Sequence, residues 1–213
     1  TIRPKKRLEP GDSYTGSFPS PFYPESLLRA TDQEYPQWVT DSYLGLPTSL
    51  PQRIRTLALR LTQDATNPYD KAAAIEKYLR SNYKYGAVNS LPGFNEDRVD
   101  HFLFQSKVGH SDHFASAMAV MLRAVGVPAR LVSGFGPGVT DEESTAFTVT
   151  EGDQHSWTEA YMPQVGWIEF EPSPIYPLRP RQAGDLAGFG AGLIGLGSDD
   201  GLLEEPELNN NDL

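Results

Sequence analysis

The 213-residue sequence contains no cysteine, so both disulfide bonds and a thiol nucleophile are excluded. It also lacks a run of the ~20 apolar residues that a membrane-spanning helix needs, and no signal peptide opens it. Basic residues are scarce, because 18 Lys and Arg stand against 28 Asp and Glu for a net charge of −10. This charge repels phosphate backbones, so nucleic acid is not expected as a partner. The chain begins Thr-Ile-Arg-Pro without Met, and we interpret it as a segment of a longer protein.

Composition divides the chain into three regions. Residues 1–47 are rich in Pro, Ser and Tyr, and we expect an extended arm, with one short strand near 14–18, whose aromatic side chains pack on the core. Residues 48–178 carry the periodic apolar patterns of a folded core domain. From residue 179 the chain is Gly-rich and then acidic, which is typical of a linker.

Three helices are predicted in the first part of the core. The first spans about 50–63, with Ser49 as its cap and Pro51 in its first turn. The second begins after the cap Asn67 and ends near Asn82. The third spans about 111–125, where apolar residues recur at helical spacing on most faces, so we expect it to lie centrally.

After Pro128 the apolar pattern changes from helical to alternating. It predicts four strands, at about 129–135, 146–150, 156–162 and 167–170, with turns between them. Helices followed by antiparallel strands indicate an α+β fold. Arg123 and Arg130, which flank the change of pattern, are expected to pair with acidic side chains.

Three residues carry a candidate catalytic chemistry. Ser111 opens the third helix directly after a polar turn, where unpaired backbone N–H groups can stabilise an anion. His155 lies near the start of the third strand, and Glu171 follows the fourth. The turn at 163–166 makes these two strands neighbours, so the carboxylate can hold one imidazole nitrogen while the other faces the nucleophile.

Each of these residues also has an ordinary structural interpretation. Ser111 could be a helix N-cap, His155 a surface or strand-end histidine, and Glu171 an exposed acid before Pro172. Their order and sequence context together favour the catalytic interpretation, because nucleophile, imidazole and acid follow one another as in papain-like enzymes. A hydroxyl, however, stands where such an enzyme needs a thiol.

Two stretches, GHSDHFASAMAVMLRAVGVPARLVSGF and HSWTEAYMPQVGWIEFEPSP, resemble the transglutaminase-like superfamily, in particular its bacterial membrane-anchored branch. That family shows Gly-x-Cys-x-x-(Phe/Tyr)-Ala, an apolar helix, Gly-(Ile/Val)-Pro-Ala-Arg, His-x-Trp-x-Glu and Gly-Trp-x-x-x-(Asp/Glu)-Pro. The likeness covers roughly residues 43–178. This sequence departs from the pattern at Ser111, which occupies the cysteine position, and has Glu171 where Asp is the commoner acid.

The resemblance implies a papain-like α+β fold with the nucleophile helix packed on an antiparallel sheet. It implies acyl transfer from a peptide or protein amide through a thioester, with hydrolysis as the side path, and Ser111, His155 and Glu171 as the triad positions. It also implies an extracytoplasmic domain of a bacterial membrane protein, with flanking transmembrane helices outside this chain.

The serine leaves the activity of this chain open. It is either an introduced Cys→Ser substitution, which the otherwise intact motif favours, or a native residue in a degenerate member. With serine we expect an inactive or nearly inactive enzyme, because a hydroxyl is a much weaker acid than a thiol. The alternatives are a non-catalytic module that binds a peptide or cell-wall component and, less favoured, a serine hydrolase.

Further side chains around the triad have weaker roles. We expect His110, Trp157 and Tyr85 to wall the site or to support an oxyanion, with Trp157 on the same strand face as His155. His110 and His113 could share a helix face, but without thiolates and a clear third ligand they do not indicate a metal site. No metal and no other cofactor is therefore expected.

Overall fold

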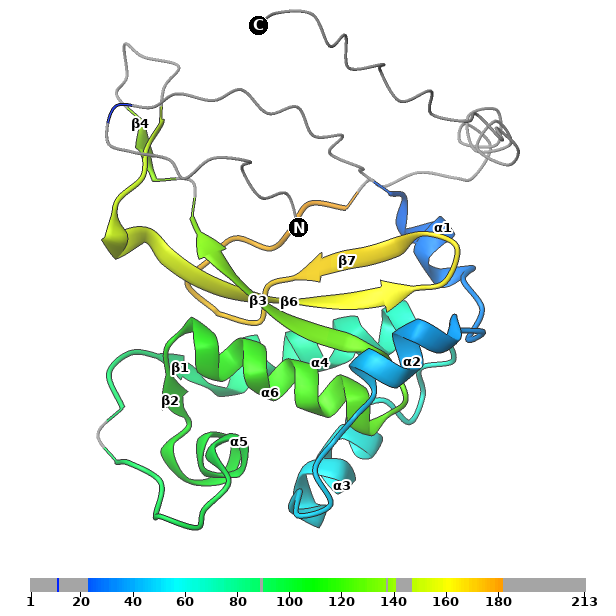
Figure 1. Ribbon diagram of the computed structural model, residues 1–213, viewed down its shortest axis with the longest axis horizontal. Coiled ribbons are helices and arrows are strands. Elements are labelled where there is room, and N and C mark those ends of the chain that lie inside the picture. The colour runs from blue at the N-terminus through cyan, green and yellow to red at the C-terminus, as the bar shows by residue number, and fades with distance from the viewer. Residues whose placement is uncertain (1–10, 12–22, 89, 137, 141–146, 182–213) are drawn as a thin grey trace, which may run out of the picture.

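Three antiparallel strands in the order β3 (Ala129–Phe135), β6 (Gln154–Met162) and β7 (Gly166–Phe170) form the main sheet. The computed structural model describes residues 11, 23–88, 90–136, 138–140 and 147–181. Helices α6 (Ser111–Ala124) and α4 (Pro68–Asn82) lie along one face of the sheet (Figure 1). The fold is α+β, with the helix of position 111 packed on an antiparallel sheet, and this confirms the predicted fold class.

The register of the sheet sets which ends of the strands meet. Gly134 near the end of β3 pairs with His155, and Thr158 in the middle of β6 pairs with Phe170, the last residue of β7. Strand β6 begins at Gln154, two residues earlier than predicted, so His155 lies within the strand. The start of β6 is therefore beside the end of β3 and the residues that follow β7.

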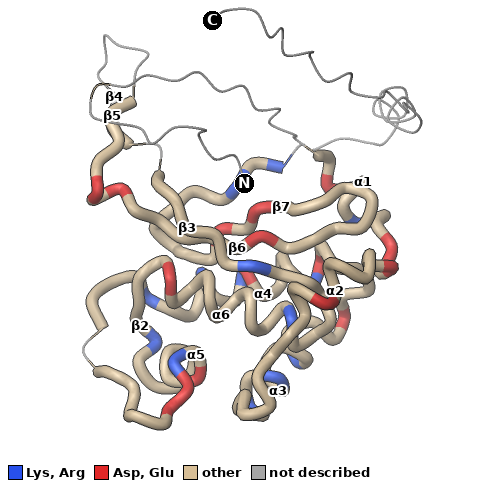
Figure 2. The backbone as a smooth tube through the Cα atoms, in the orientation of Figure 1, with Lys and Arg blue, Asp and Glu red and all other residues tan. Residues whose placement is uncertain are grey.

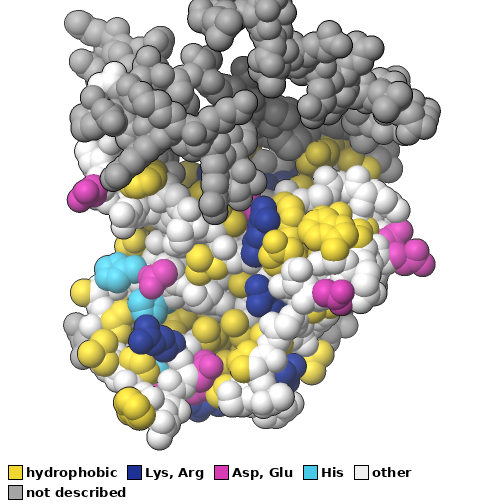
Figure 3. Space-filling model, viewed as in Figure 1, with side chains coloured by type: hydrophobic (Ala, Val, Ile, Leu, Met, Phe, Trp, Pro, Cys, Tyr) yellow, Lys and Arg dark blue, Asp and Glu magenta, His cyan; other side chains and the backbone are white. Residues whose placement is uncertain are grey.

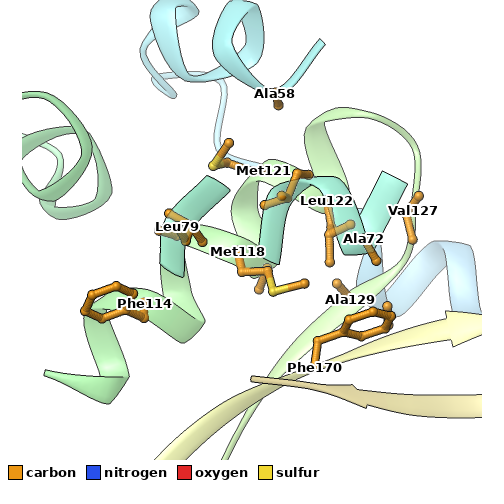
Figure 4. Packing of buried hydrophobic residues seen from close by; sticks show 14 of the residues in the cluster. Ala58, Ala72, Leu79, Phe114, Met118, Met121, Leu122, Val127, Ala129 and Phe170 are labelled. Carbon is orange, nitrogen blue, oxygen red and sulfur yellow. The ribbon is translucent and has the colours of Figure 1, made fainter. Parts of the chain in front are cut away.

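Helix α6 is the centre of the core, as its pattern predicted. Its buried side chains pack between the sheet and α4, where Figure 4 shows Met118 and Leu122 near Ala129 and Phe170. Thr158 Oγ1 of β6 donates to the Ala115 carbonyl at 3.0 Å, a close approach that the small residue allows. Complete burial of such side chains gives most of the helix's stability, about 1.5–3 kcal/mol for each large one.

The end of α6 has a Schellman motif. Gly126 has φ of 78°, a left-handed conformation that glycine adopts without strain. The Gly126 N–H donates to the Arg123 carbonyl at 3.2 Å, and the Val127 N–H donates to the Leu122 carbonyl at 3.0 Å. These bonds turn the chain directly from α6 into β3, which is why helix and strand lie in adjacent layers.

The first two predicted helices are present, with one error at a cap. Helix α4 begins at Pro68 after Asn67, whose side chain accepts the Asp70 N–H at 2.8 Å, as expected. Helix α3 spans Gln52–Leu61, and its N-cap is Pro51 without a side-chain bond. The prediction that Ser49 caps this helix is wrong, because the chain enters the helix two residues later.

The segment between α4 and α6 holds elements that periodicity did not predict. Short strands β1 (Lys84–Tyr85) and β2 (Val108–Gly109) form a parallel pair. Between them lie α5 (Arg98–His101) and a π-helical turn (Phe102–Ser106). The parallel pair fixes Tyr85 beside the first turn of α6.

Two short helices begin the described chain, α1 (Glu25–Arg29) and α2 (Gln37–Tyr43), and neither was predicted. Their N-caps are Pro24 and Pro36, so these prolines start helices here rather than exclude them. The ring of Trp38 lies edge-on against Tyr161 of β6. The strand expected near 14–18 and most of the linker expected from 179 lie outside the described residues.

The remaining strands form a separate ribbon of β4 (Val139–Thr140) and β5 (Phe147–Thr148), shorter than the strand expected at 146–150. A 3₁₀ turn at Glu151–Asp153 then leads into β6. Among the described residues, no helix combines the length and the apolar character required to cross a bilayer.

Arg123 and Arg130, both expected to pair with acidic side chains, have different hydrogen-bond partners. Arg130 pairs with Glu159 across β3 and β6 at 2.6 Å, as expected. The expectation is wrong for Arg123, because its guanidinium donates to the backbone carbonyls of Ala129 and Gly45 instead of a carboxylate. Burial lowers the pKa of Arg123, and the two carbonyls compensate for part of the lost hydration.

Gly109 controls how closely β2 approaches the start of α6. A Cβ at this position would lie 2.7 Å from His113 Cβ and 3.1 Å from Phe102 Cε2. We predict that Gly109→Ala lowers the free energy of unfolding by about 1–3 kcal/mol, because the first turn of α6 must move. Urea denaturation followed by circular dichroism measures this change. Gly45→Ala is the matched control, since nothing lies within 4 Å of its Cβ, and equal effects of the two changes would contradict the prediction.

Candidate active site

A pocket of about 430 Å³ opens where the start of α6 meets the end of β3 and the start of β6. Three separate segments line it, so only the folded chain can form it. The lining residues are Ser111, Asp112, Ser133, Gly134, Phe135, Gln154, His155 and Ser156.

Ser111 is the first residue of α6 and is only 7% exposed. The N-cap of the helix is His110, so the alternative interpretation of Ser111 as the N-cap is wrong. Instead, Ser111 Oγ accepts the Ser156 N–H at 3.2 Å. The side chain thus contacts the backbone next to His155, at a helix end whose first amides carry positive potential.

His155 and Glu171 are in direct contact. The distance between His155 Nε2 and Glu171 Oε2 is 2.5 Å, and the residues are 4% and 1% exposed. The exposed-acid interpretation of Glu171 is therefore wrong, and His155, although near the beginning of a strand, is not a surface residue. The second oxygen of Glu171 accepts the Ser173 N–H at 3.0 Å, so both carboxylate oxygens have partners.

The other nitrogen of the imidazole is unpaired. His155 Nδ1 is buried and has no hydrogen-bond partner among the residues that the structure describes. No hydrogen bond joins it to Ser111 within that part of the chain, although both side chains line the same pocket. The structure thus pairs imidazole with carboxylate and places the Ser111 hydroxyl next to them without a bond to the ring.

Tyr176, which the sequence did not indicate, covers the imidazole. Its ring stacks on that of His155, with centroids 3.7 Å apart and planes at 27°. Burial and a hydrogen bond with Tyr85 raise the pKa of Tyr176 to about 12, so its hydroxyl stays neutral. Tyr85, expected to support an oxyanion, contacts Tyr176 edge-on at 6.0 Å and is not among the described residues that line the pocket of Ser111 and His155.

Arg80 of α4 fastens the segment that carries Glu171 and Tyr176. Its guanidinium donates to the carbonyls of Glu171 at 2.8 Å, Ser173 at 2.6 Å and Tyr176 at 2.9 Å. One planar guanidinium thus binds three backbone carbonyls of the segment that follows β7. The acid and the stacking ring are held by the same side chain.

Glu76, one turn before Arg80, binds the same segment. Its Oε1 accepts the Glu171 N–H at 2.6 Å. Burial raises the pKa of Glu76 to about 7, an effect that the Glu171 N–H and the nearby Arg181 and Arg80 only partly offset. A backbone hydrogen bond therefore joins Glu171 to a carboxyl whose pKa is raised by burial.

The other expected wall residues lie farther out. The Trp157 ring is nearly parallel to His155 at 6.1 Å, on the same strand face as predicted, with its edge against Gly134. His110 does not line the triad pocket but a second one on the other side of the helix start. Among the described residues, no three His, Asp or Glu side chains are grouped to hold a metal ion.

The sequence contained only a faint signal for the residues that were missed. Glu76 and Arg80 lie four apart on α4 beside the buried Ile75 and Leu79, so two charges border an apolar stripe. Such a pattern usually marks the solvent boundary of a helix. Their role depends on where the chain after β7 passes, which periodicity does not show.

The raised pKa of Glu76 predicts a pH-dependent stability. The folded state binds this proton more tightly than the unfolded chain, where a glutamate titrates near ~4.3, so the free energy of unfolding falls as pH rises from about 4.5 to about 7. Glu76→Gln should remove this contribution, on the order of 2 kcal/mol, and still accept the Glu171 N–H.

Urea denaturation at pH 5, 6 and 7 measures the slope. Glu34→Gln, at an exposed glutamate, is the matched control and should keep the pH dependence of the unchanged chain. An identical slope in Glu76→Gln and the unchanged chain would show that Glu76 does not bind a proton on folding in this range.

Known proteins resemble this chain in sequence. A sequence model of the transglutaminase-like superfamily matches residues 55–172. The chain is 44% identical over 172 residues to the uncharacterized protein YebA of Bacillus subtilis, covering 76% of this chain and 23% of YebA. It is 31% identical over 161 residues to a protein-glutamine gamma-glutamyltransferase of Pseudomonas aeruginosa, covering 75% and 23% respectively. It thus spans less than a quarter of either relative.

A solved structure shows the same fold. The crystal structure of the periplasmic domain of TgpA from Pseudomonas aeruginosa superposes with a TM-score of 0.57 at 32% sequence identity. The match covers 66% of this chain and 48% of that domain. Because the superfamily model covers more than half of the chain and includes all three triad positions, the chain belongs to the transglutaminase-like superfamily.

Proposed function

We propose that this chain is a transglutaminase-like acyl-transfer domain with Ser111, His155 and Glu171 at the triad positions, inactive or nearly so while residue 111 is serine. The observation that carries the proposal is the imidazole of His155. Its Nε2 is bound to the buried Glu171 carboxylate, while its Nδ1 has no partner among the described residues and Ser111 lines the same pocket. This is the arrangement expected of a general base next to a nucleophile.

The reaction begins with proton transfer when residue 111 is cysteine. His155 takes the thiol proton on Nδ1, and Glu171 stabilises the resulting imidazolium through Nε2. The thiolate attacks the amide carbonyl of the substrate, and the carbonyl oxygen becomes an oxyanion. Unpaired N–H groups in the first turn of α6 are positioned to bind that oxygen.

The intermediate then loses an amine. His155 returns its proton to the leaving nitrogen, the carbon–nitrogen bond breaks, and a thioester to residue 111 remains. An incoming amine, or water in the hydrolytic side path, attacks the thioester and gives its proton to His155. The carbon–sulfur bond then breaks, and the leaving thiolate takes the proton back from His155, which restores the free thiol. Glu171 binds Nε2 throughout, while Nδ1 gains and loses the proton.

Serine interrupts the first step. A hydroxyl is a much weaker acid than a thiol, so an imidazole arranged for a thiolate does not deprotonate it efficiently. In addition, no hydrogen bond joins the Ser111 hydroxyl to His155 Nδ1 among the residues that the structure describes. Both facts support a silent nucleophile position in an otherwise complete site.

A non-catalytic binding module is the second candidate. The hydrogen bond from the Ser156 N–H to Ser111 Oγ favours a binding module, because the hydroxyl is held by the backbone rather than by the imidazole. In this case the pocket binds a peptide or cell-wall component without turnover.

A serine hydrolase differs from both, because Ser111 would then be labelled covalently by a fluorophosphonate.

The substrate class follows from one relative. The Pseudomonas aeruginosa protein is named as acting on protein glutamine, and we propose that the acyl donor here is likewise a glutamine side chain in a peptide or protein. Its carboxamide is a neutral primary amide, which suits a pocket with mixed polar and apolar lining.

The central prediction concerns Ser111→Cys. The new thiol, the only one in the chain, should be alkylated by iodoacetamide with an apparent pKa well below ~8.5, because His155 and the start of α6 stabilise the thiolate. His155→Gln in the same background should slow alkylation at pH 7 at least about tenfold. The variant should also release ammonia from a glutamine peptide, measured by a coupled assay.

Ser49→Cys supplies the control, a thiol at an exposed position two residues before the N-cap of α3, so it also lies close to a helix start. If the Ser111→Cys thiol titrates like that of Ser49→Cys, the proposed base is not acting on residue 111. Absence of ammonia release despite a low thiol pKa would instead favour the binding module.

We also propose an extracytoplasmic location, in a bacterial membrane protein with transmembrane helices that flank this chain. The support is the likeness to a periplasmic domain. In spheroplasts that make the full-length protein, added protease should cleave this domain while a cytoplasmic marker stays intact. Protection of the domain until the membrane is lysed would exclude this location.

A further inference from the structure

A second cavity of about 550 Å³ lies on the other side of the start of α6 from the triad pocket. His110 and His113 line it, and they flank Ser111 in sequence. The Tyr85 ring contacts His110 edge-on at 5.6 Å and also touches Tyr176, which covers His155. Because Ser111 and Asp112 line the first pocket and His110 and His113 line the second, a peptide that crosses the start of α6 can reach both.

The cavity is basic in an acidic chain. Its lining includes Arg98 and the imidazoles of His101, His110 and His113, and no Asp or Glu is among the described residues that line it. Figure 3 shows histidine and basic side chains gathered on one part of the surface, with an acidic side chain and hydrophobic ones beside them. In a chain of net charge −10, this local excess of donors favours an anion.

Arg98 is the one Lys or Arg among the described residues that line the cavity, and no acid pairs with it. Neighbouring acids are engaged: Asp97 accepts backbone N–H groups at the start of α5, and Asp100 pairs with Arg53. Basic and acidic positions lie next to each other on and before α5 (Figure 2). Arg98 itself has no hydrogen bond or ion pair within the described part of the chain, so its guanidinium is available to a ligand.

The imidazoles differ in availability. His101 is buried, and its Nε2 lies 3.3 Å from Ser90 Oγ. His113 Nδ1 lies 2.9 Å from the Asp112 carboxylate, which brings a negative charge to that side of the cavity. The positive end of the cavity is therefore at Arg98, with imidazole N–H groups as secondary donors.

The opposite wall is apolar and comes from the loop after β1. Ala87, Val88, Leu91 and Pro92 line it, and Leu91 is 86% exposed although it borders a cavity. An exposed leucine facing a guanidinium suits a ligand with a short aliphatic stem and a carboxylate end. A carboxylate also matches the planar fork of arginine.

We propose that this cavity binds the carboxylate of an acidic residue near the reacting glutamine of the peptide substrate, with Arg98 as its ion-pair partner. This inference rests on the function proposed above. The proposed ion pair predicts a preference for substrates in which a glutamate or aspartate lies a few residues from the reacting glutamine.

Binding to the unchanged chain tests the cavity without catalysis. The probes are hexapeptides with blocked ends and a glutamine near the middle. Each peptide carries a single glutamate, at a different flanking position in each, and its matched neutral peptide has glutamine in place of that glutamate. Isothermal titration calorimetry at low ionic strength should show about 5–10-fold tighter binding for at least one glutamate peptide. Arg98→Gln should remove this preference, so that the glutamate and neutral peptides bind with equal affinity.

Arg60→Gln, at an exposed arginine of α3, is the matched control and should retain the preference. In the Ser111→Cys background, the same peptides should differ in KM and not in kcat. Equal affinity for the glutamate and neutral peptides at every position, or a preference that survives Arg98→Gln, overturns the proposal. A preference in binding combined with an inactive Ser111→Cys variant would support the cavity and refute the catalytic function.

Discussion

The buried contact between His155 and Glu171 is the constraint on which the site depends. Removing an imidazole and a carboxylate from water is unfavourable unless both are paired and hydrogen-bonded. Glu171 meets this requirement through His155 Nε2 and the Ser173 N–H. The contact needs the β6–β7 hairpin, because only a short antiparallel connection returns residue 171 to the beginning of β6. The fold and the triad acid are thus specified together.

The path of the chain after β7 explains why Arg80 is required. Pro172 and Pro174 have no N–H, so this segment cannot continue the hydrogen-bond ladder of the sheet. Its carbonyls are left to other donors, and Arg80 supplies several from one planar group. Glu76 accepts the Glu171 N–H. Two residues of α4 therefore replace the missing neighbouring strand, and they fix Glu171 and Tyr176 relative to His155.

Sequence alone predicted what depends on local periodicity. Helices at 68–82 and 111–124 and the paired strands around residues 163–166 repeat their patterns over many residues, so the fold class and the meeting of His155 with Glu171 could be inferred. Arg80 and Tyr176 could not, because their contacts join segments more than 90 residues apart or depend on a proline-rich path. Very short elements such as α5 also escaped, since a single turn shows no period.

Most of the interactions that hold the site together do not involve residue 111. Glu171, Ser173, Arg80, Glu76 and Tyr176 fix the imidazole from the sheet and from α4. Ser111 contributes one hydrogen bond, to the Ser156 backbone. Its helix start is positioned independently by the packing of α6 and by β2. His155 Nδ1 is the one buried polar atom of Ser111, His155 and Glu171 that the described contacts leave unpaired. The groups that orient the imidazole are therefore held by contacts that do not depend on the Ser111 side chain, so a substitution at position 111 changes the chemistry proposed for the pocket more directly than it changes the architecture around it.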